Sequence, residues 1–225
     1  MSGRTSPYAD RRAAGEELAS QLSAYRERDD VRVLALPRGG VPVAAPVAAA
    51  LGAPLDVLVV RKLGLPGQPE LAMGAIAGVG DEVELVRNER VLAAARVPPG
   101  AFEAVLERER AELVRRERAY REGRAAVRVR DATVVVVDDG LATGATMRAA
   151  VAAVRRRSPA RLVVAVPVGA ADTCDALRRE ADDVVCAWTP EPFHAVGQAY
   201  GDFRPTEDDE VRAVLREAAV AHERR

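Results

Sequence analysis

One stretch, residues 133–146, constrains the fold more than any other part of this chain. Thr133 is followed by four consecutive valines, which predicts a fully buried strand of a parallel sheet. The strand ends at Asp138 and Asp139, and a turn of small residues then leads into a helix expected to begin near Thr143. A buried strand, such a turn and a helix N-terminus form an anion site, because backbone N–H groups and the helix dipole converge there.

The two acids indicate what the bound anion must carry. An ionised carboxylate accepts hydrogen bonds and donates none, so Asp138 and Asp139 cannot bind the phosphate itself. Adjacent carboxylates beside a phosphate site suit a vicinal diol, and a phosphorylated ribose has both groups. The residues expected to surround the phosphate are Gly140, Leu141, Ala142, Thr143, Gly144, Ala145 and Thr146.

Residues 134–146 resemble the 5-phosphoribosyl 1-diphosphate (PRPP) motif of type I phosphoribosyltransferases. That motif has four apolar residues, two acids and then Gly-x-x-Thr-Gly-x-Thr, and it is matched here without a gap. In that family the acids hold the ribose 2′- and 3′-hydroxyls, and the following loop wraps the 5′-phosphate. The alternative is an ordinary buried strand followed by an acidic turn, against which the register of acids, glycines and threonines argues.

Apolar segments on either side of the motif alternate between strands and helices. Strands are expected at 31–36, 55–60, 162–166 and 184–187, and helices after an N-cap at Asp10, over 43–51 and over about 171–180. This alternation implies right-handed crossovers and a parallel sheet. Together with the resemblance it predicts an α/β fold, a type I phosphoribosyltransferase-like parallel sheet flanked by helices, with a small hood and a long inserted helix.

A second turn that suits an anion, Pro37-Arg38-Gly39-Gly40, follows the first predicted strand of the sheet. Open α/β sheets bind ligands at the carboxyl ends of their strands, and an arginine can bind phosphate through two donors. In the resembled family the corresponding loop receives pyrophosphate, often through a cis peptide. The resemblance therefore implies this role for Arg38, Gly39 and Gly40. The alternative is a glycine-rich turn with a solvated arginine.

Arg61 and Lys62 follow the next strand, and Lys62 is the only lysine in an arginine-rich chain. The pair is similar to one in orotate phosphoribosyltransferases at the base of a mobile loop. The resemblance implies pyrophosphate binding by both and, for Lys62, a catalytic role with Asp138 and Asp139; an accidental surface lysine is the alternative. Residues 63–70 contain two glycines and two prolines and are predicted to form a loop that covers the site.

Three further segments complete the pattern. Residues 71–79 and 81–86 are predicted to form a hairpin that continues the edge of the sheet. A long helix is expected over 98–122, and its alternating glutamates and arginines argue against a nucleic-acid-binding helix. The last helix is expected to begin with a capping box formed by Thr206 and Asp209.

Trp188 and Phe193 lie in an aromatic, proline-rich segment after the last predicted strand. Four of the eight aromatic residues of the chain fall between Trp188 and Phe203. In the resembled family this segment helps to form a hood over the nucleobase, so Trp188 or Phe193 is a candidate to stack on a flat base. The alternative is that these rings seal the end of the sheet.

Length and composition limit the remaining classes. A chain of 225 residues can form a single phosphoribosyltransferase-like domain over 1–225. We expect a core over about 8–187 with a helical insertion over about 88–124, then a hood and C-terminal helix over about 188–225. A net charge of −1 argues against nucleic acid as a partner. The sequence contains no apolar run long enough to predict a membrane span, and residues 1–4 lack an apolar signal region. With only two cysteines and no metal-like spacing, a cytoplasmic protein is expected.

The resemblance implies an enzyme, a pentosyltransferase that moves the 5-phosphoribosyl group between PRPP and a nitrogenous base, a purine or pyrimidine, and releases pyrophosphate. It implies Mg²⁺ held mainly by PRPP and water, with Asp138 or Asp139 as the side chains that would join them. Nucleotide salvage in the cytoplasm and a homodimer are also expected. Two alternatives stay open, a PRPP-sensing regulatory protein without turnover and a sugar-phosphate-binding hydrolase. The pattern is most similar to the bacterial group named "putative phosphoribosyltransferase".

Overall fold

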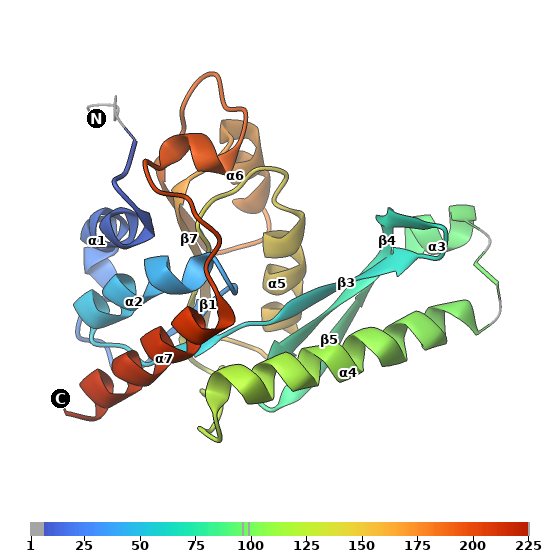
Figure 1. Cartoon of the computed structure of the whole chain (residues 1–225), viewed down its shortest axis with the longest axis horizontal. Coiled ribbons are helices and arrows are strands. Elements are labelled where there is room, and N and C mark those ends of the chain that lie inside the picture. Colours follow the sequence, from blue (N-terminus) through green and yellow to red (C-terminus); the bar gives the residue numbers. More distant parts are fainter. Residues whose placement is uncertain (1–6, 96, 99, 225) are drawn as a thin grey trace.

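The centre of the fold is a five-stranded parallel sheet with the strand order β2-β1-β6-β7-β8 (Figure 1). The computed structural model describes residues 7–95, 97–98 and 100–224, so the predicted lack of a signal region in residues 1–4 lies outside it. The strands are β1 (Val31–Ala35), β2 (Leu55–Val57), β6 (Thr133–Val137), β7 (Arg161–Val168) and β8 (Asp183–Trp188). The predicted α/β fold with a parallel sheet flanked by helices is confirmed, and the valine strand is its middle strand.

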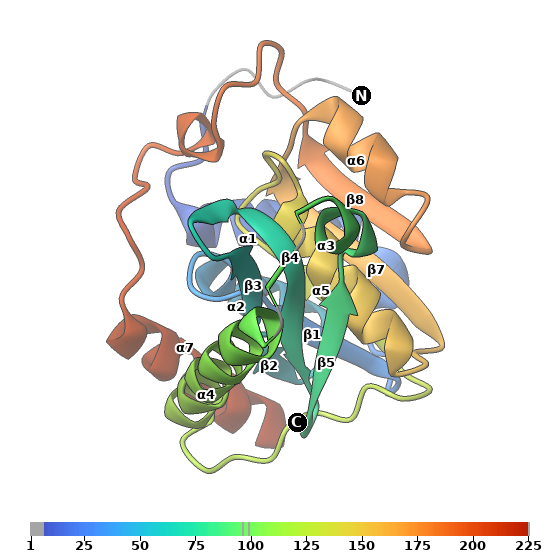
Figure 2. The same ribbon diagram turned by 90° about the vertical axis from the view of Figure 1, so that its right-hand side faces the viewer.

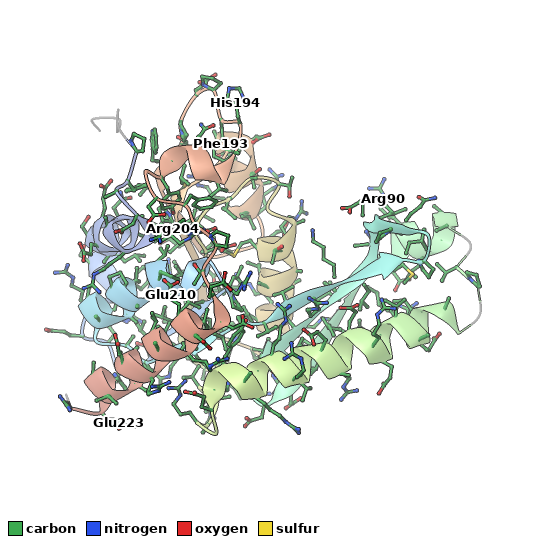
Figure 3. The ribbon with its side chains drawn as sticks, in the orientation of Figure 1. Arg90, Phe193, His194, Arg204, Glu210 and Glu223 are labelled. Carbon is green, nitrogen blue, oxygen red and sulfur yellow. The ribbon has the colours of Figure 1, made fainter. Side chains whose placement is uncertain are left out.

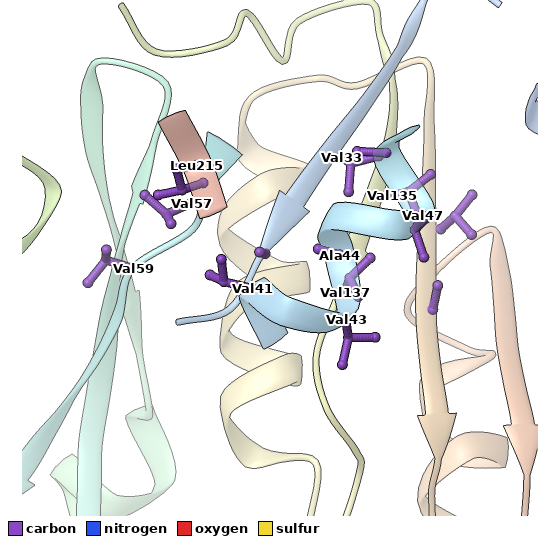
Figure 4. Close-up of a cluster of buried hydrophobic side chains, with 14 of the residues drawn as sticks. Val33, Val41, Val43, Ala44, Val47, Val57, Val59, Val135, Val137 and Leu215 are labelled. Carbon is purple, nitrogen blue, oxygen red and sulfur yellow. The ribbon is translucent and has the colours of Figure 1, made fainter. Parts of the chain in front are cut away.

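Helices cover both faces of this sheet because successive strand residues point to opposite sides. Val135 and Val137 of β6 pack on one face with α1, α2 and α7, as Figure 4 shows for α2 and α7. Val134 and Val136 pack on the other face with α5 and α6. These helices are α1 (Arg11–Gln21), α2 (Gly40–Leu51), α5 (Ala145–Arg156), α6 (Ala171–Leu177) and α7 (Asp208–Glu223). No helix in the described part of the chain is long and apolar enough to cross a membrane.

A second, antiparallel sheet forms an arm that projects from the core (Figures 1 and 2). The arm consists of β3 (Val60–Leu65), β4 (Gln68–Val79), β5 (Glu82–Arg87), α3 (Glu89–Ala95) and α4 (Ala101–Arg121). The prediction that the hairpin continues the edge of the main sheet is therefore wrong. The chain leaves the main sheet at Leu58 and Val59, so the strand predicted over 55–60 ends at Val57.

The loop predicted over residues 63–70 is also wrong, because these residues form the ends of β3 and β4 and the turn between them. Gly67 has φ +82°, which suits the tight turn. A Cβ atom on Gly64 would lie 2.7 Å from the carbonyl oxygen of Pro69, so a glycine is needed where the two strands approach. Register shifts on both sides of Gly64 show that it marks an irregularity within a strand.

Several helix ends differ from their predicted positions. α5 begins at Ala145 and not at Thr143, because Gly144 is its N-cap with φ +68°. α6 ends at Leu177, whose carbonyl accepts two hydrogen bonds from the turn that follows. The capping box at the start of α7 is wrong: the N-cap is Glu207, and Asp209 pairs with Arg212 of the same helix. The N-cap at Asp10 is confirmed, since its side chain accepts a hydrogen bond from Ala13 N–H at 2.8 Å.

Candidate functional site

The two predicted anion turns lie in contact at the carboxyl edge of the main sheet, because β1 and β6 are neighbours. A Cβ atom on Gly40 would lie 2.8 Å from the carbonyl oxygen of Val137, and one on Gly39 would lie 2.1 Å from Oδ2 of Asp139. Only glycine leaves room for this approach. The Pro37–Arg38 peptide bond is cis, as the resemblance implies.

The phosphate loop, residues 140–146, connects β6 to α5. Leu141 fixes it to β7, since its N–H bonds to Val168 O at 2.9 Å and its carbonyl accepts from Ala170 N–H at 2.9 Å. The N–H of Leu141 is thus already used within the protein. The first hydrogen bond of α5 runs from Arg148 N–H to Gly144 O, so the N–H groups of the preceding turn have no intrahelical acceptor. The loop therefore presents backbone donors at the edge of the sheet.

Each carboxylate of the acid pair is held through one oxygen. Oδ1 of Asp138 accepts a hydrogen bond from the N–H of Asp139 at 2.9 Å. Oδ2 of Asp139 accepts one from Nε of Arg11 at 2.8 Å. Within residues 7–95, 97–98 and 100–224, no other residue donates a hydrogen bond to the second oxygen of either carboxylate. Two adjacent side chains thus each retain one acceptor.

Burial disfavours the ionised form of both acids. It raises the pKa of Asp138 well above the ordinary value, and the charge of Asp139 raises that pKa further. Burial also raises the pKa of Asp139, although the hydrogen bond and positive charge of Arg11 oppose the rise. A ligand that donates hydrogen bonds to the remaining oxygens would relieve the loss of water around both groups.

Arg11 was not among the residues predicted for the site, yet it contacts both the acid pair and the C-terminal strap, residues 200–207. Nη1 of Arg11 donates to the carbonyl of Arg204 at 2.8 Å, and its guanidinium lies 4.0 Å from the centre of the Phe203 ring. The Tyr200 hydroxyl donates to the carbonyl of Asp139 at 2.5 Å. The strap, which runs down to α7 in Figure 2, therefore contacts Asp139 directly at its backbone carbonyl and is linked to the Asp139 side chain through Arg11.

The predicted pyrophosphate residues have acidic partners in the structure. Nη1 of Arg38 lies 3.5 Å from Glu207 and 3.8 Å from Asp208, at the start of α7. Arg61 donates twice to Oε2 of Glu109 on α4, at 2.9 Å and 2.6 Å. Sequence reasoning found none of these acids. Nothing near them in the sequence distinguishes them from the other acids of the chain.

Lys62 is exposed on β3. Together with Arg61 and Thr146 it lines a pocket of about 610 Å³ between the arm and the phosphate loop. The structure therefore brings Lys62 and Arg61 toward the N-terminus of α5, whereas Arg38 extends from the opposite turn toward α7. The predicted binding residues surround the carboxyl edge without forming one closed pocket.

The predicted base-stacking residues lie at the end of β8 and in the segment 189–199 that follows it, which is the segment predicted to form the hood, and both are partly buried. The ring centres of Trp188 and Tyr8 lie 6.3 Å apart in an edge-to-face arrangement. Trp188 and Phe193 both pack against a small cluster that includes Tyr8 and Tyr200. Phe193 lies with His194 at the top of the hood, away from Arg204 of the strap (Figure 3). The aromatic pair beside the acids is instead Tyr200 and Phe203, whose rings stack at 5.1 Å.

A parallel sheet with glycine turns at the carboxyl ends of adjacent strands is an arrangement typical of nucleotide- and phosphate-binding α/β proteins. Residues 8–200 match the model of the phosphoribosyl transferase domain. The chain belongs to the phosphoribosyl transferase family, whose enzymes are pentosyltransferases.

Similar proteins agree with this assignment. Two proteins from strains of Mycobacterium tuberculosis, each named "Putative phosphoribosyl transferase", are 47% identical over 208 residues, which is 92% of this chain and 46% of each relative. The chain thus spans about half the length of these curated relatives. The crystal structure of TT1426 from Thermus thermophilus is 43% identical, with a TM-score of 0.80, and the match covers 94% of this chain and 98% of that one.

Proposed function

We propose that the protein transfers the 5-phosphoribosyl group between PRPP and a nitrogenous base, a purine or a pyrimidine, with release of pyrophosphate. The observation that carries this proposal is the pair of carboxylate oxygens on Asp138 and Asp139 that no described residue occupies, next to a helix N-terminus with open backbone donors. A phosphate and a vicinal diol separated in this way belong to a sugar phosphate. Inorganic phosphate would use the loop alone.

In this proposal the substrate spans the edge of the sheet. The diol is held by Asp138 and Asp139, and the pyrophosphate by Arg38 and Lys62 with the backbone of the glycine turn. Arg61 would have to release Glu109 to join them. The residues that would surround the 5′-phosphate are Gly140, Ala142, Thr143, Gly144, Ala145 and Thr146, while Leu141 anchors the loop.

The rate enhancement would come from positioning and from charge stabilisation. The arginine and lysine donors would stabilise the negative charge of the departing pyrophosphate, with Lys62 free to move because its side chain is exposed. The two carboxylates would support the cation-like sugar that develops as the bond at C1 breaks. A nitrogen of the base then attacks C1 from the hood side.

The acid pair also fits Mg²⁺. No group of three or more histidine, cysteine or acidic side chains in the described part of the chain could hold a metal by itself. Mg²⁺ keeps several waters and is commonly bound by one or two carboxylates together with substrate phosphates. Asp138 or Asp139 would supply such an oxygen, and the bound ion would neutralise charge on the pyrophosphate.

The remaining expectations belong to the same proposal. They are a single domain over 1–225, a homodimer, a role in nucleotide salvage and a cytoplasmic location. The base would lie under the hood, where Trp188 or Phe193 could stack on it if the hood opens. The near-neutral charge favours a small base over nucleic acid as the acceptor.

The test has two stages. Calorimetry with PRPP and Mg²⁺, compared with inorganic phosphate, asks whether the site recognises the sugar as well as the phosphate. A panel of purine and pyrimidine bases, scored for pyrophosphate release, then asks for turnover. We expect PRPP to bind more tightly than phosphate and at least one base to release pyrophosphate. Binding without release across the panel would favour a PRPP-sensing protein, and equal affinity for PRPP and phosphate would refute the proposal.

A further inference from the structure

We propose that Arg11 is a positioning residue for the sugar: it holds one oxygen of Asp139 so that the other faces the ribose diol. The inference rests on the proposed function and adds to it a residue from the first helix, 128 positions away in the sequence. It would explain how a side chain outside both anion turns contributes to recognition of the substrate.

The contacts of Arg11 leave its guanidinium little freedom. Nε donates a hydrogen bond to Asp139 and Nη1 donates one to the carbonyl of Arg204, both at 2.8 Å, while the guanidinium carbon lies over the ring of Phe203, 4.0 Å from its centre. The side chain of Arg11 is 11% exposed, and that of Asp139 is 16% exposed. An ion pair removed from water in this way has a defined geometry, unlike most surface ion pairs.

These contacts require an arginine. The guanidinium offers donors in a fixed plane, so it can serve the Asp139 carboxylate and a backbone carbonyl while its face stacks on an aromatic ring. A lysine ammonium at position 11 would keep the charge but could not provide this plane. The same helix supplies a natural comparison in Arg12, which is 78% exposed and pairs with Glu16 at 3.3 Å.

The effect on Asp139 is to fix which oxygen remains available. Oδ2 lies between Arg11 and the backbone of Gly39, where even a single added carbon would approach it to 2.1 Å. Oδ1 accepts no hydrogen bond from any other residue in the described part of the chain. Since Asp138 is held through its own Oδ1, each acid presents one fixed acceptor, and a vicinal diol has one hydroxyl for each.

A purely structural role for Arg11, fastening the strap to α1, makes a different prediction. If Arg11 only attached the strap to α1, its loss would lower the affinity of the site for every ligand alike. Loss of a positioned carboxylate would weaken only ligands that carry the diol, because the hydrogen bonds of Arg11 go to Asp139 and the strap and not to the phosphate loop. Two ligands that differ only in the diol can therefore separate the two roles.

The experiment uses 1,4-anhydroribitol 5-phosphate and tetrahydrofurfuryl phosphate, which share the ring and the phosphate and differ in the two hydroxyls. Calorimetry would measure both with the unmodified protein, R11Q, R11K and the matched control R12Q. We expect the unmodified protein and R12Q to prefer the diol at least about tenfold, as for hydrogen bonds to charged groups. R11Q should lose most of this preference, and its affinity for tetrahydrofurfuryl phosphate should equal that of the unmodified protein. The preference of R11K for the diol should lie between that of R11Q and that of the unmodified protein.

The outcomes separate this inference from the proposed function. If the unmodified protein shows no preference for the diol, the sugar phosphate site itself is refuted. If the unmodified protein prefers the diol and both R11Q and R11K retain this preference, the positioning role of Arg11 is refuted while the proposed function stands. The same holds if R11Q lowers the affinity for both ligands equally. Should R11Q fail to fold, F203L serves as a second variant. It removes the aromatic ring under the Arg11 guanidinium but keeps both Arg11 and Asp139. An unchanged diol preference in F203L and R11K would then overturn the inference.

Discussion

Replacing each acid of the pair by asparagine should have very different effects on folding stability. Asp139→Asn removes the ionic partner of Arg11, whose side chain is 11% exposed. Breaking a buried ion pair by removing one member costs roughly 3–5 kcal/mol, because the other charge stays buried. An asparagine oxygen can still accept one hydrogen bond from Arg11, which places the expected loss near the lower end, at about 3 kcal/mol.

Asp138→Asn should be neutral or slightly stabilising. Its carboxylate is held only through the N–H of Asp139 among the described donors, and an amide oxygen can accept the same bond. The substitution also removes a buried charge beside a second one, and burial and that neighbouring charge are what raise the pKa of Asp138. For a chain of this size about 1 kcal/mol corresponds to roughly 2–4 °C, so the melting temperatures of the two variants should differ by about 6–12 °C.

The pH dependence of folding stability provides a second test of the role assigned to Asp138. Because the folded chain binds the Asp138 proton more tightly than the unfolded chain does, this group favours folding at low pH, and that contribution is lost as pH rises from about 4 through the raised pKa. Asp138→Asn should abolish this decrease in stability with rising pH, because asparagine does not ionise. Its advantage over the unmodified protein should therefore grow as the pH increases.

Thermal unfolding in phosphate-free buffer at several pH values measures both effects, and calorimetry with PRPP accompanies it. Both variants should bind PRPP more weakly, so binding alone does not distinguish the acids. Equal melting temperatures for the two variants, or a larger loss in Asp138→Asn, would refute the assignment of Arg11 to Asp139 as a stabilising buried pair.

Three further substitutions test other parts of the site and its support. Gly39→Ala places a methyl group 2.1 Å from Oδ2 of Asp139, so PRPP affinity measured by calorimetry should fall about tenfold or more. Lys62→Arg should lower pyrophosphate release more than PRPP affinity; full activity would show that the lysine is accidental. Burial raises the pKa of Glu117 to about 7, so stability should fall as pH rises from about 4.5 to 7, by up to about 3 kcal/mol, and Glu117→Gln should abolish this slope in pH-dependent unfolding.

The parts of the site that could be predicted from sequence are those encoded in short segments. Residues 133–146 contain a buried strand, two acids and a helix start in one run, and the Pro37–Gly40 turn follows a strand in the same way. Because parallel strands end at one edge of a sheet, two such turns on neighbouring strands must lie close together. The contact of Gly39 and Gly40 with the acid pair follows from this rule.

The parts that could not be predicted depend on contacts between distant segments. Arg11 and Arg12 are adjacent on the same helix, and only the position of Asp139 in the fold decides which of them is buried. Arg61 resembled a ligand-binding residue because Glu109, its partner, lies 48 positions away. The loop predicted over residues 63–70 failed for a local reason, since glycine and proline interrupt helices yet are tolerated at a hairpin turn and at a strand irregularity.

The close packing of Gly39 against Asp139 has a consequence for how this family can diverge. Any side chain at position 39 would collide with Oδ2 of Asp139 and displace Arg11 from it. Without its hydrogen bond to Asp139, the Arg11 guanidinium would no longer be held over the ring of Phe203. Substitution at one of these positions should therefore be accompanied by substitution at the others. Homologous sequences should carry the glycine, the acid, the arginine and the aromatic ring as one co-inherited set, or replace them together.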